Sequence, residues 1–182
     1  MRVSLILLSV SIFCLCIGAR AQQKTRLGQN VVQPAMVAAC GDVNLSMAVN
    51  LDNKQHPVAQ PGPGMAQIYF IQDTGLSITI AYPTTKIGID GKWVGANKKN
   101  SYFSVFVAPG EHHLCAAIQS SFVQNDIELA HLTAEAGTVY YYRTRIITSK
   151  DGPLYLGFVP VDSDEAQYMI ASFPQATAHA RK

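Results

Sequence analysis

The chain has 182 residues, 48% of them hydrophobic, and its 14 basic and 12 acidic side chains almost balance. This length allows one domain with a sizeable core. The near-neutral charge gives no indication of electrostatic binding to nucleic acid or to anionic lipid, and we expect no nucleic-acid partner.

Residues 1–21 predict a cleavable signal peptide. Arg2 supplies a positive start, residues 3–18 are almost wholly apolar, and small residues precede the expected cleavage point at Ala21. The apolar run is shorter than the roughly 20 residues that a membrane span needs. We therefore expect an exported protein that is periplasmic, extracellular or associated with the envelope, with no transmembrane segment in its mature chain.

The mature chain is expected to begin with a flexible arm over residues 22–39, which are Gln-rich and have no clear period. A β-sandwich domain is predicted over residues 40–174. Apolar residues alternate with polar ones over 43–51 and 76–82, and strand-like runs recur at 66–71, 86–89, 92–94, 102–108, 111–118, 138–148 and 154–161. Residues 127–133 fit a strand or a short helix. This spacing of strands and turn signals indicates a mainly all-β fold, an antiparallel sandwich or barrel, of which we favour the sandwich.

Asp90-Gly91 between two strand-like runs predicts a tight hairpin. A two-residue turn makes Gly88 oppose Trp93, so we expect the indole ring to cover the bare glycine. Ile87 and Val94 should then point to the other face of the sheet.

One short helix is expected near the C-terminus. Asp162 is its predicted N-cap, Glu165 completes a capping box, and Pro174 ends it. Its apolar side is expected to include Tyr168, Met169 and Ala171. Residues 175–182 have no pattern and are predicted to be a disordered tail.

Two cysteines, Cys40 and Cys115, remain after the expected cleavage. In an oxidising compartment, two is the natural number for one disulfide, so we predict that they are joined. Two separate buried thiols are the alternative.

Three segments, KIGIDGKWVG, NSYFSVFVAPGEHHLC and LTAEAGTVYYYRTR, together resemble a bacterial family of small exported proteins and lipoproteins whose domain has no assigned function. The resemblance covers roughly residues 64–161, and the central part is similar to the sandwich modules of bacterial surface proteins. It implies a β-sandwich in the cell envelope and no catalytic residue. The chain differs from the lipoproteins because Cys14 and Cys16 lie inside the apolar run, where lipidation is not expected.

The stretch from Glu111 to Cys115 contains His112 and His113, which are metal ligands in principle. Neighbouring residues on a strand face opposite sides, so the two histidines do not readily share one ion. His131 is a further candidate, and a metal-dependent hydrolase around the three histidines is one hypothesis. The alternative is a histidine near a tight turn that holds backbone groups. We expect no metal site, no cofactor and no catalytic residue.

Tyr141, Arg143 and Arg145 lie on one side of the predicted strand 138–148, opposite a set expected in the core. This face is a candidate binding surface for a glycan or a small anion, and its alternative is an ordinary solvated face. The leading hypothesis is an exported, non-enzymatic structural or interaction module of the cell envelope, whose partner is an envelope protein or a glycan.

Overall fold

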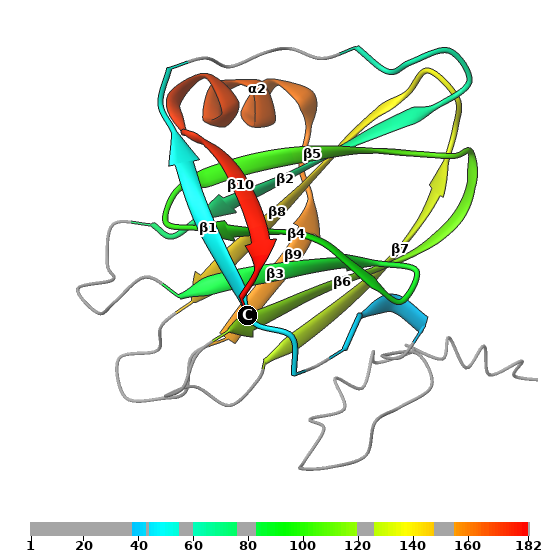
Figure 1. Ribbon diagram of the computed structural model, residues 1–182. Helices are drawn as coiled ribbons and strands as arrows, with labels where there is room; N and C mark the ends of the chain where they lie inside the picture. The colour runs from blue at the N-terminus through cyan, green and yellow to red at the C-terminus, as the bar shows by residue number, and fades with distance from the viewer. Residues whose placement is uncertain are drawn as a thin grey trace, which may run out of the picture. The chain divides into compact units, whose positions relative to one another are not determined.

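The computed structural model describes residues 38–42, 44–54, 60–75, 83–119, 126–147 and 155–181. Within these ranges the chain forms two β-sheets that pack face to face and one α-helix (Figure 1). The predicted all-β sandwich with one short C-terminal helix is therefore confirmed. None of the helical segments in the described ranges has the length and apolar character needed to cross a lipid bilayer. The strand expected over 76–82 lies outside the described residues.

The larger sheet has six strands, whose spatial order differs from the chain order. From one edge to the other these are β1 (Met47–Asp52), β10 (Gln175–Ala180), β5 (Ser101–Val107), β2 (Ala66–Asp73), β8 (Val139–Ile147) and β9 (Tyr155–Pro160). The β2–β8 and β10–β5 pairs are parallel and the other pairs are antiparallel. The expected antiparallel sandwich is therefore corrected to one with a mixed sheet. β2 and β8 can pair in parallel because no hairpin joins them, and the long stretch of chain between them includes strands of both sheets.

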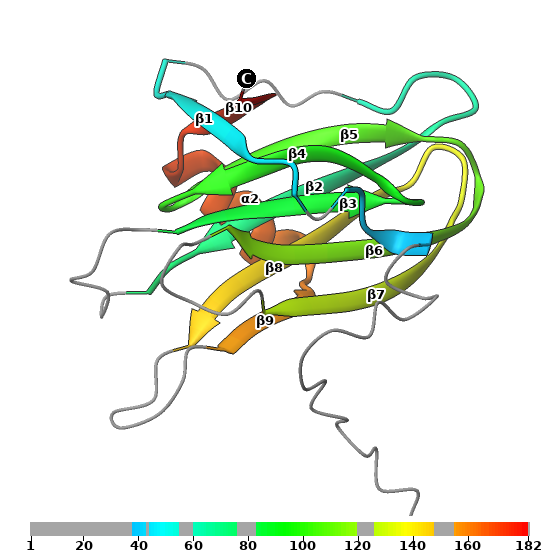
Figure 2. The ribbon, with the colours of Figure 1, turned by 60° about the horizontal axis from the view of Figure 1, so that its bottom comes forward.

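The smaller sheet has four antiparallel strands. Their order is β4 (Lys92–Lys98), β3 (Thr84–Ile89), β6 (Gly110–Gln119) and β7 (Ile127–Ala134) (Figure 2). The ambiguous residues 127–133 thus belong to a strand, and their register against β6 is continuous over eight residue pairs.

The main core lies between the two sheets and is built by the period-two alternation of their strands. It combines Ile68 and Phe70 of β2 with Ile87 of β3 and Leu114 of β6, all fully buried. As the alternation in β8 predicts, Tyr142 and Ile146 join this core, and Thr144 is fully buried beside them.

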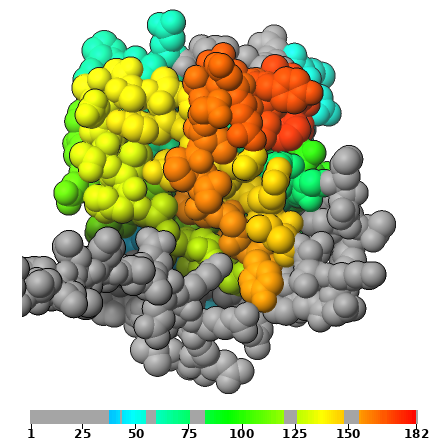
Figure 3. Space-filling view, turned by 180° about the vertical axis from the view of Figure 1, so that it is seen from behind, coloured from blue at the N-terminus to red at the C-terminus, as the bar shows by residue number. Residues whose placement is uncertain are grey.

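A second, smaller cluster lies on the outer face of the six-stranded sheet, beneath helix α2 (Ser163–Ser172). The orange residues of β9 and α2 form a continuous strip across this face in Figure 3. Asp162 caps the helix as predicted, because its Oδ1 atom accepts hydrogen bonds from the backbone N–H groups of Asp164 and Glu165.

The buried side of α2 differs from the expected one. Ala166, Met169 and Ile170 are buried, in the i, i+3, i+4 pattern of a helix face, whereas Tyr168 is 76% exposed. The choice of Tyr168 and Ala171 was wrong because it did not follow this periodicity.

The expected disordered tail over 175–182 is also corrected, since residues 175–180 form β10. All six residues of β10 pair with β1, and the Tyr102 backbone N–H donates to the Pro174 carbonyl at the start of the strand. The sequence QATAHA has little intrinsic strand preference. Pairing with β1, which lies far away in the chain, therefore determines its conformation.

The β3–β4 hairpin confirms that Gly88 opposes Trp93. A β-bulge then shifts the register, so that Ile87 opposes Gly95 and Val94 becomes the extra residue, 37% exposed. The expectation that Val94 shares a face with Ile87 was therefore wrong. Beside the bulge, the Phe103 ring occupies the space where a Cβ on Gly95 would lie, so this position needs a glycine.

Candidate functional site

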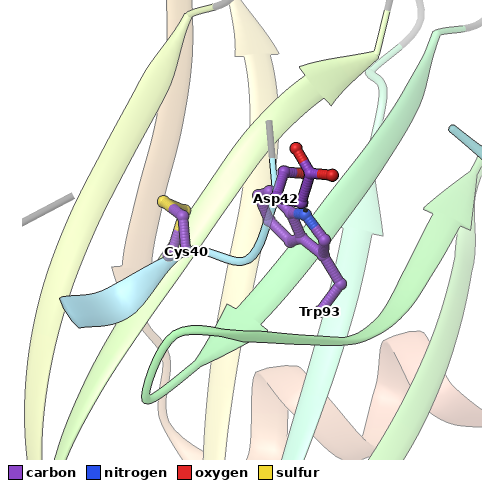
Figure 4. The surroundings of a disulfide bond; sticks show 4 residues. Cys40, Asp42 and Trp93 are labelled. Carbon is purple, nitrogen blue, oxygen red and sulfur yellow. Dashed lines mark hydrogen bonds between the residues drawn. A yellow bond between two sulfur atoms is a disulfide. The ribbon is translucent and has the colours of Figure 1, made fainter. Parts of the chain in front are cut away.

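Residues 38–42 and 44–46, here called the N-terminal strap, cross the outer face of the four-stranded sheet. Near one end, Cys40 is joined to Cys115 of β6 (Figure 4). Further along, the Trp93 indole N–H donates to the Asp42 carbonyl at 2.6 Å, and the Lys86 ammonium donates to the Leu45 carbonyl at 2.7 Å. Each attachment joins the strap to a different strand of the sheet.

The predicted disulfide between Cys40 and Cys115 is confirmed, with 5.2 Å between the two Cα atoms. Both cysteines are buried, together with Ala39 and the partly buried Trp93. The expected flexible arm over 22–39 is corrected at its last residue, because Ala39 is 2% exposed and packs on the sheet. Residues 22–37 of that expected arm lie outside the described residues.

Gly88 allows the strap to approach the sheet closely. A Cβ at this position would lie 2.8 Å from the Ala39 carbonyl oxygen, 3.1 Å from the Cys40 Cα and 3.3 Å from the Trp93 ring. The glycine is therefore covered by the indole, as predicted, and also by the strap, which the sequence did not reveal.

Lys86 is an unusual residue beneath the strap because it is 5% exposed. Its ammonium lies 4.4 Å from the centroid of the Trp93 ring, which is a cation–π contact. Burial lowers the pKa of Lys86, while the nearby Asp42 carboxylate acts in the opposite direction. The lysine thus links the strap to the sheet through its charge and its hydrogen bond.

The β3–β4 turn and the start of β6 are joined through Asp90 and His112. The Asp90 carboxylate lies 2.6 Å from His112 Nδ1 and also accepts a hydrogen bond from the His113 backbone N–H at 2.8 Å. The other ring nitrogen of His112 lies 2.8 Å from the Ala108 carbonyl oxygen. Both ring nitrogens therefore face acceptors, which is the arrangement that suits a protonated imidazole.

Asp90 and His112 each favour the charged form of the other. Burial alone lowers the pKa of His112, but the Ala108 carbonyl and the Asp90 carboxylate outweigh it, so that the pKa is raised. Burial alone raises the pKa of Asp90, but hydrogen bonds from His112 and from the His113 backbone lower it. The His112 side chain therefore links the β3–β4 turn to the segment before β6, as the structural interpretation of this histidine predicted. Because both of its nitrogens are engaged, neither is free to act as a general base.

We expect His112→Asn to lower the free energy of unfolding by roughly 1 kcal/mol at about pH 5.5 and by less at about pH 9. The raised pKa of His112 means that its contribution is complete below the ordinary value of 6.5 and is lost as pH rises through the folded-state value. The lowered pKa of Asp90 means that its contribution is complete above 3.8 and is lost as pH falls through the folded-state value. Solvent screening limits the effect, because Asp90 is 48% exposed.

Denaturant unfolding of the wild type and of His112→Asn at both pH values measures this difference. The matched control is His179→Asn, which removes an exposed histidine of β10. An equal loss of stability at the two pH values would contradict a role for the charge.

The candidate surface of Tyr141, Arg143 and Arg145 is partly occupied by contacts within the chain. Arg143 forms an ion pair with Glu165 of α2, and Tyr141 stacks on Tyr69 beside the helix with 5.5 Å between ring centroids. The helix therefore covers one part of the face that the sequence predicted to be solvated.

Arg145, which is 48% exposed, forms an ion pair with Asp73 of β2. Burial alone raises the pKa of Asp73, but the Arg145 guanidinium and the Gly75 backbone N–H outweigh it and hold the pKa below its ordinary value. Each arginine of the candidate surface thus has a carboxylate partner, which an anionic ligand would have to displace.

The structure separates the residues of the candidate metal site. His112 joins the turns, and the Cys115 sulfur is in the disulfide. His113 of β6 lies opposite His131 of β7 on the outer face, with 5.4 Å between ring centroids. Across the described ranges, no three His, Cys, Asp or Glu side chains stand gathered for a metal ion.

The fold defines the class of the protein as a two-sheet β-sandwich with a disulfide-anchored N-terminal strap. A family model described as "Protein of unknown function (DUF2846)" matches residues 63–157, and because this is more than half of the chain, the protein belongs to that family. No curated protein and no solved structure matches the chain. The match overlaps most of residues 64–161, which carry the resemblance seen in the sequence.

Proposed function

We propose that this chain is an exported, non-enzymatic β-sandwich protein that serves as a structural or interaction module of the bacterial cell envelope. The observation that carries the proposal is the Cys40–Cys115 bridge. Such bridges form and persist in oxidising compartments, and this one joins a residue shortly after the expected leader to the centre of a sheet. The signal-like pattern of residues 1–21 independently favours the same route.

The arrangement of His112 supports the non-enzymatic part of the proposal. General acid–base catalysis needs a group that can reach a substrate proton, and both nitrogens of His112 already contact Asp90 and Ala108. The family adds no assigned activity, since its description is that of a protein of unknown function.

A module that binds a glycan or a small anion is the alternative function. It would use Tyr141, Arg143 and Arg145, but both arginines are already paired with carboxylates. We favour the structural or interaction role because such a ligand would lose part of its binding free energy in breaking these pairs. A glycan array with the wild type and an Arg143→Gln, Arg145→Gln variant distinguishes the two functions, and binding that depends on the arginines would favour the alternative.

Cell fractionation of a bacterium that expresses the full chain tests the exported location. We expect a chain that begins at Gln22 outside the cytoplasm, with both mature cysteines resistant to alkylation in denaturant until a reductant is added. The matched control lacks residues 2–21 and should remain in the cytoplasm with reactive thiols. A full-length chain retained in the cytoplasm with residues 1–21 intact would contradict the proposal.

A further inference from the structure

We propose that Asn44, in the N-terminal strap, is a site of N-linked glycosylation. Asn44-Leu45-Ser46 has the sequence of an N-linked acceptor, in which a hydroxyl residue stands two positions after the asparagine, and no other asparagine of the chain is followed in this way. Asp42 precedes Asn44 by two positions, and bacterial oligosaccharyltransferases commonly need an acidic residue there. The proposal rests on the exported location proposed above, because this motif is used in secreted proteins.

The structure places the acceptor in an exposed turn. The alternation over residues 43–51 would put Asn44 inside a strand, but β1 begins only at Met47. The Leu45 backbone N–H closes the turn by donating to the Asp42 carbonyl at 3.1 Å. The Asp42 Oδ1 atom accepts a hydrogen bond from the Asn44 backbone N–H at 2.9 Å, as in an Asx turn. Asn44 is exposed at this turn, which is the surface setting that a glycan needs.

The strap beside Asn44 is held by the carbonyl groups of its neighbours. The Leu45 carbonyl accepts from the Lys86 ammonium, and the Ser46 carbonyl accepts from the Arg181 backbone N–H at 2.8 Å. These contacts use backbone oxygens and leave the Asn44 side chain outside them. A sugar on the Asn44 Nδ2 atom therefore displaces none of them, and the folded protein can carry the glycan.

The position of Asn44 in the chain suits a transferase that acts during export. The residues that hold the strap to the sheet, Lys86, Trp93 and Cys115, all follow Asn44 in sequence. When the N-terminal part of the chain emerges first, these residues are not yet available to bind the strap. The transferase can therefore bind the acceptor as an extended segment before the strap is attached to the sheet.

The donor of the reaction is an oligosaccharide that is joined through a diphosphate to a polyprenol lipid. The Asn44 Nδ2 atom forms a bond to C1 of the first sugar as the bond from C1 to the diphosphate oxygen breaks. The lipid diphosphate leaves with that electron pair and takes up the proton that the amide nitrogen loses. The step involves no oxidation or reduction.

Expression of the full chain in a bacterium that contains an oligosaccharyltransferase and its lipid-linked glycan tests the proposal. We expect mass spectrometry of the exported protein to show one added glycan, located on Asn44. Asn44→Gln and Ser46→Ala should each abolish the added mass. Asp42→Ala should reduce the modified fraction severalfold, whereas Asp42→Glu should retain it. Circular dichroism checks that each variant is folded.

Asn50→Gln is the matched control, because Asn50 is also exposed and also followed by leucine, but Asp52 takes the place of the hydroxyl residue. It should leave the glycan in place. A second chain, in which an established export signal replaces residues 1–21, separates this proposal from the exported location. Modification of the second chain alone would support the site and contradict the native leader. The glycosylation proposal is overturned if the exported second chain gains no mass while a standard acceptor protein is modified in the same cells, or if Asn44→Gln keeps the glycan.

Discussion

Replacing Cys40 and Cys115 together by serine should lower the free energy of unfolding by up to about 4–5 kcal/mol, because the bridge restricts a long loop in the unfolded chain. The two cysteines are 75 residues apart in sequence. Strain and residual structure commonly reduce the effect of a disulfide, so this figure is an upper value. The stability of a domain is typically about 5–15 kcal/mol, so the bridge could contribute roughly half of a value in the middle of that range.

Urea denaturation followed by circular dichroism measures the loss. Fluorescence gives a local signal as well, because the single tryptophan of the chain, Trp93, contacts the strap through the Asp42 carbonyl. The double variant is preferable to a single one, which would leave a reactive thiol behind.

A reducing agent provides the control. It should bring the wild type down to the stability of the double variant and leave the variant itself unchanged. If the variant and the oxidised wild type unfold at the same urea concentration, the bridge contributes nothing to stability.

Features that depend on neighbouring residues could be predicted from the sequence. The Asp90-Gly91 hairpin is an example, because Asp90 and Gly91 both have positive φ, at 50° and 77°, and this dipeptide favours such a turn. The Asp162 cap is another, since it involves backbone groups only two and three residues away. The disulfide could be predicted by elimination, because only one pairing remained.

Features that join distant parts of the chain could not be predicted in the same way. The partner of Asp90 is His112, and the partners of Arg143 and Arg145 are Glu165 and Asp73. Nothing local marks these pairs, because each depends on which strands become neighbours. The candidate binding face was interpreted as solvated for this reason, since the position of α2 over it has no signal in the strand itself.

Segments of the described chain lie on both sides of the residues that match the family model. The match covers residues 63–157, so the strap, β1, α2 and β10 lie outside it. They are nevertheless attached to the matched part, through the disulfide to Cys115 and through the Glu165–Arg143 ion pair. We infer that in this chain the two ends cover opposite outer faces, the strap on the four-stranded sheet and α2 on the six-stranded sheet.

Phe70→Ala should cause a loss of stability comparable to that of removing the disulfide, about 3–5 kcal/mol. Phe70 is fully buried on β2, which lies inside the six-stranded sheet between β5 and β8. Its ring packs against Phe103, Tyr142 and Phe158, with centroid distances of 5.4, 6.3 and 6.3 Å. Removing it leaves a cavity between the sheets that these rings, each fixed by its own strand, can fill only in part.

Phe106→Ala is the matched control, because it makes the same change in the same sheet on the adjacent strand β5. Phe106 is 49% exposed, so its loss should cost about 1 kcal/mol or less, since a half-exposed ring buries less apolar area. Denaturant unfolding with the disulfide intact compares the two variants directly. Equal losses from Phe70→Ala and Phe106→Ala would mean that burial between the sheets does not determine stability. A much larger loss from Phe70→Ala would show that the aromatic cluster does, and would locate the principal core on β2.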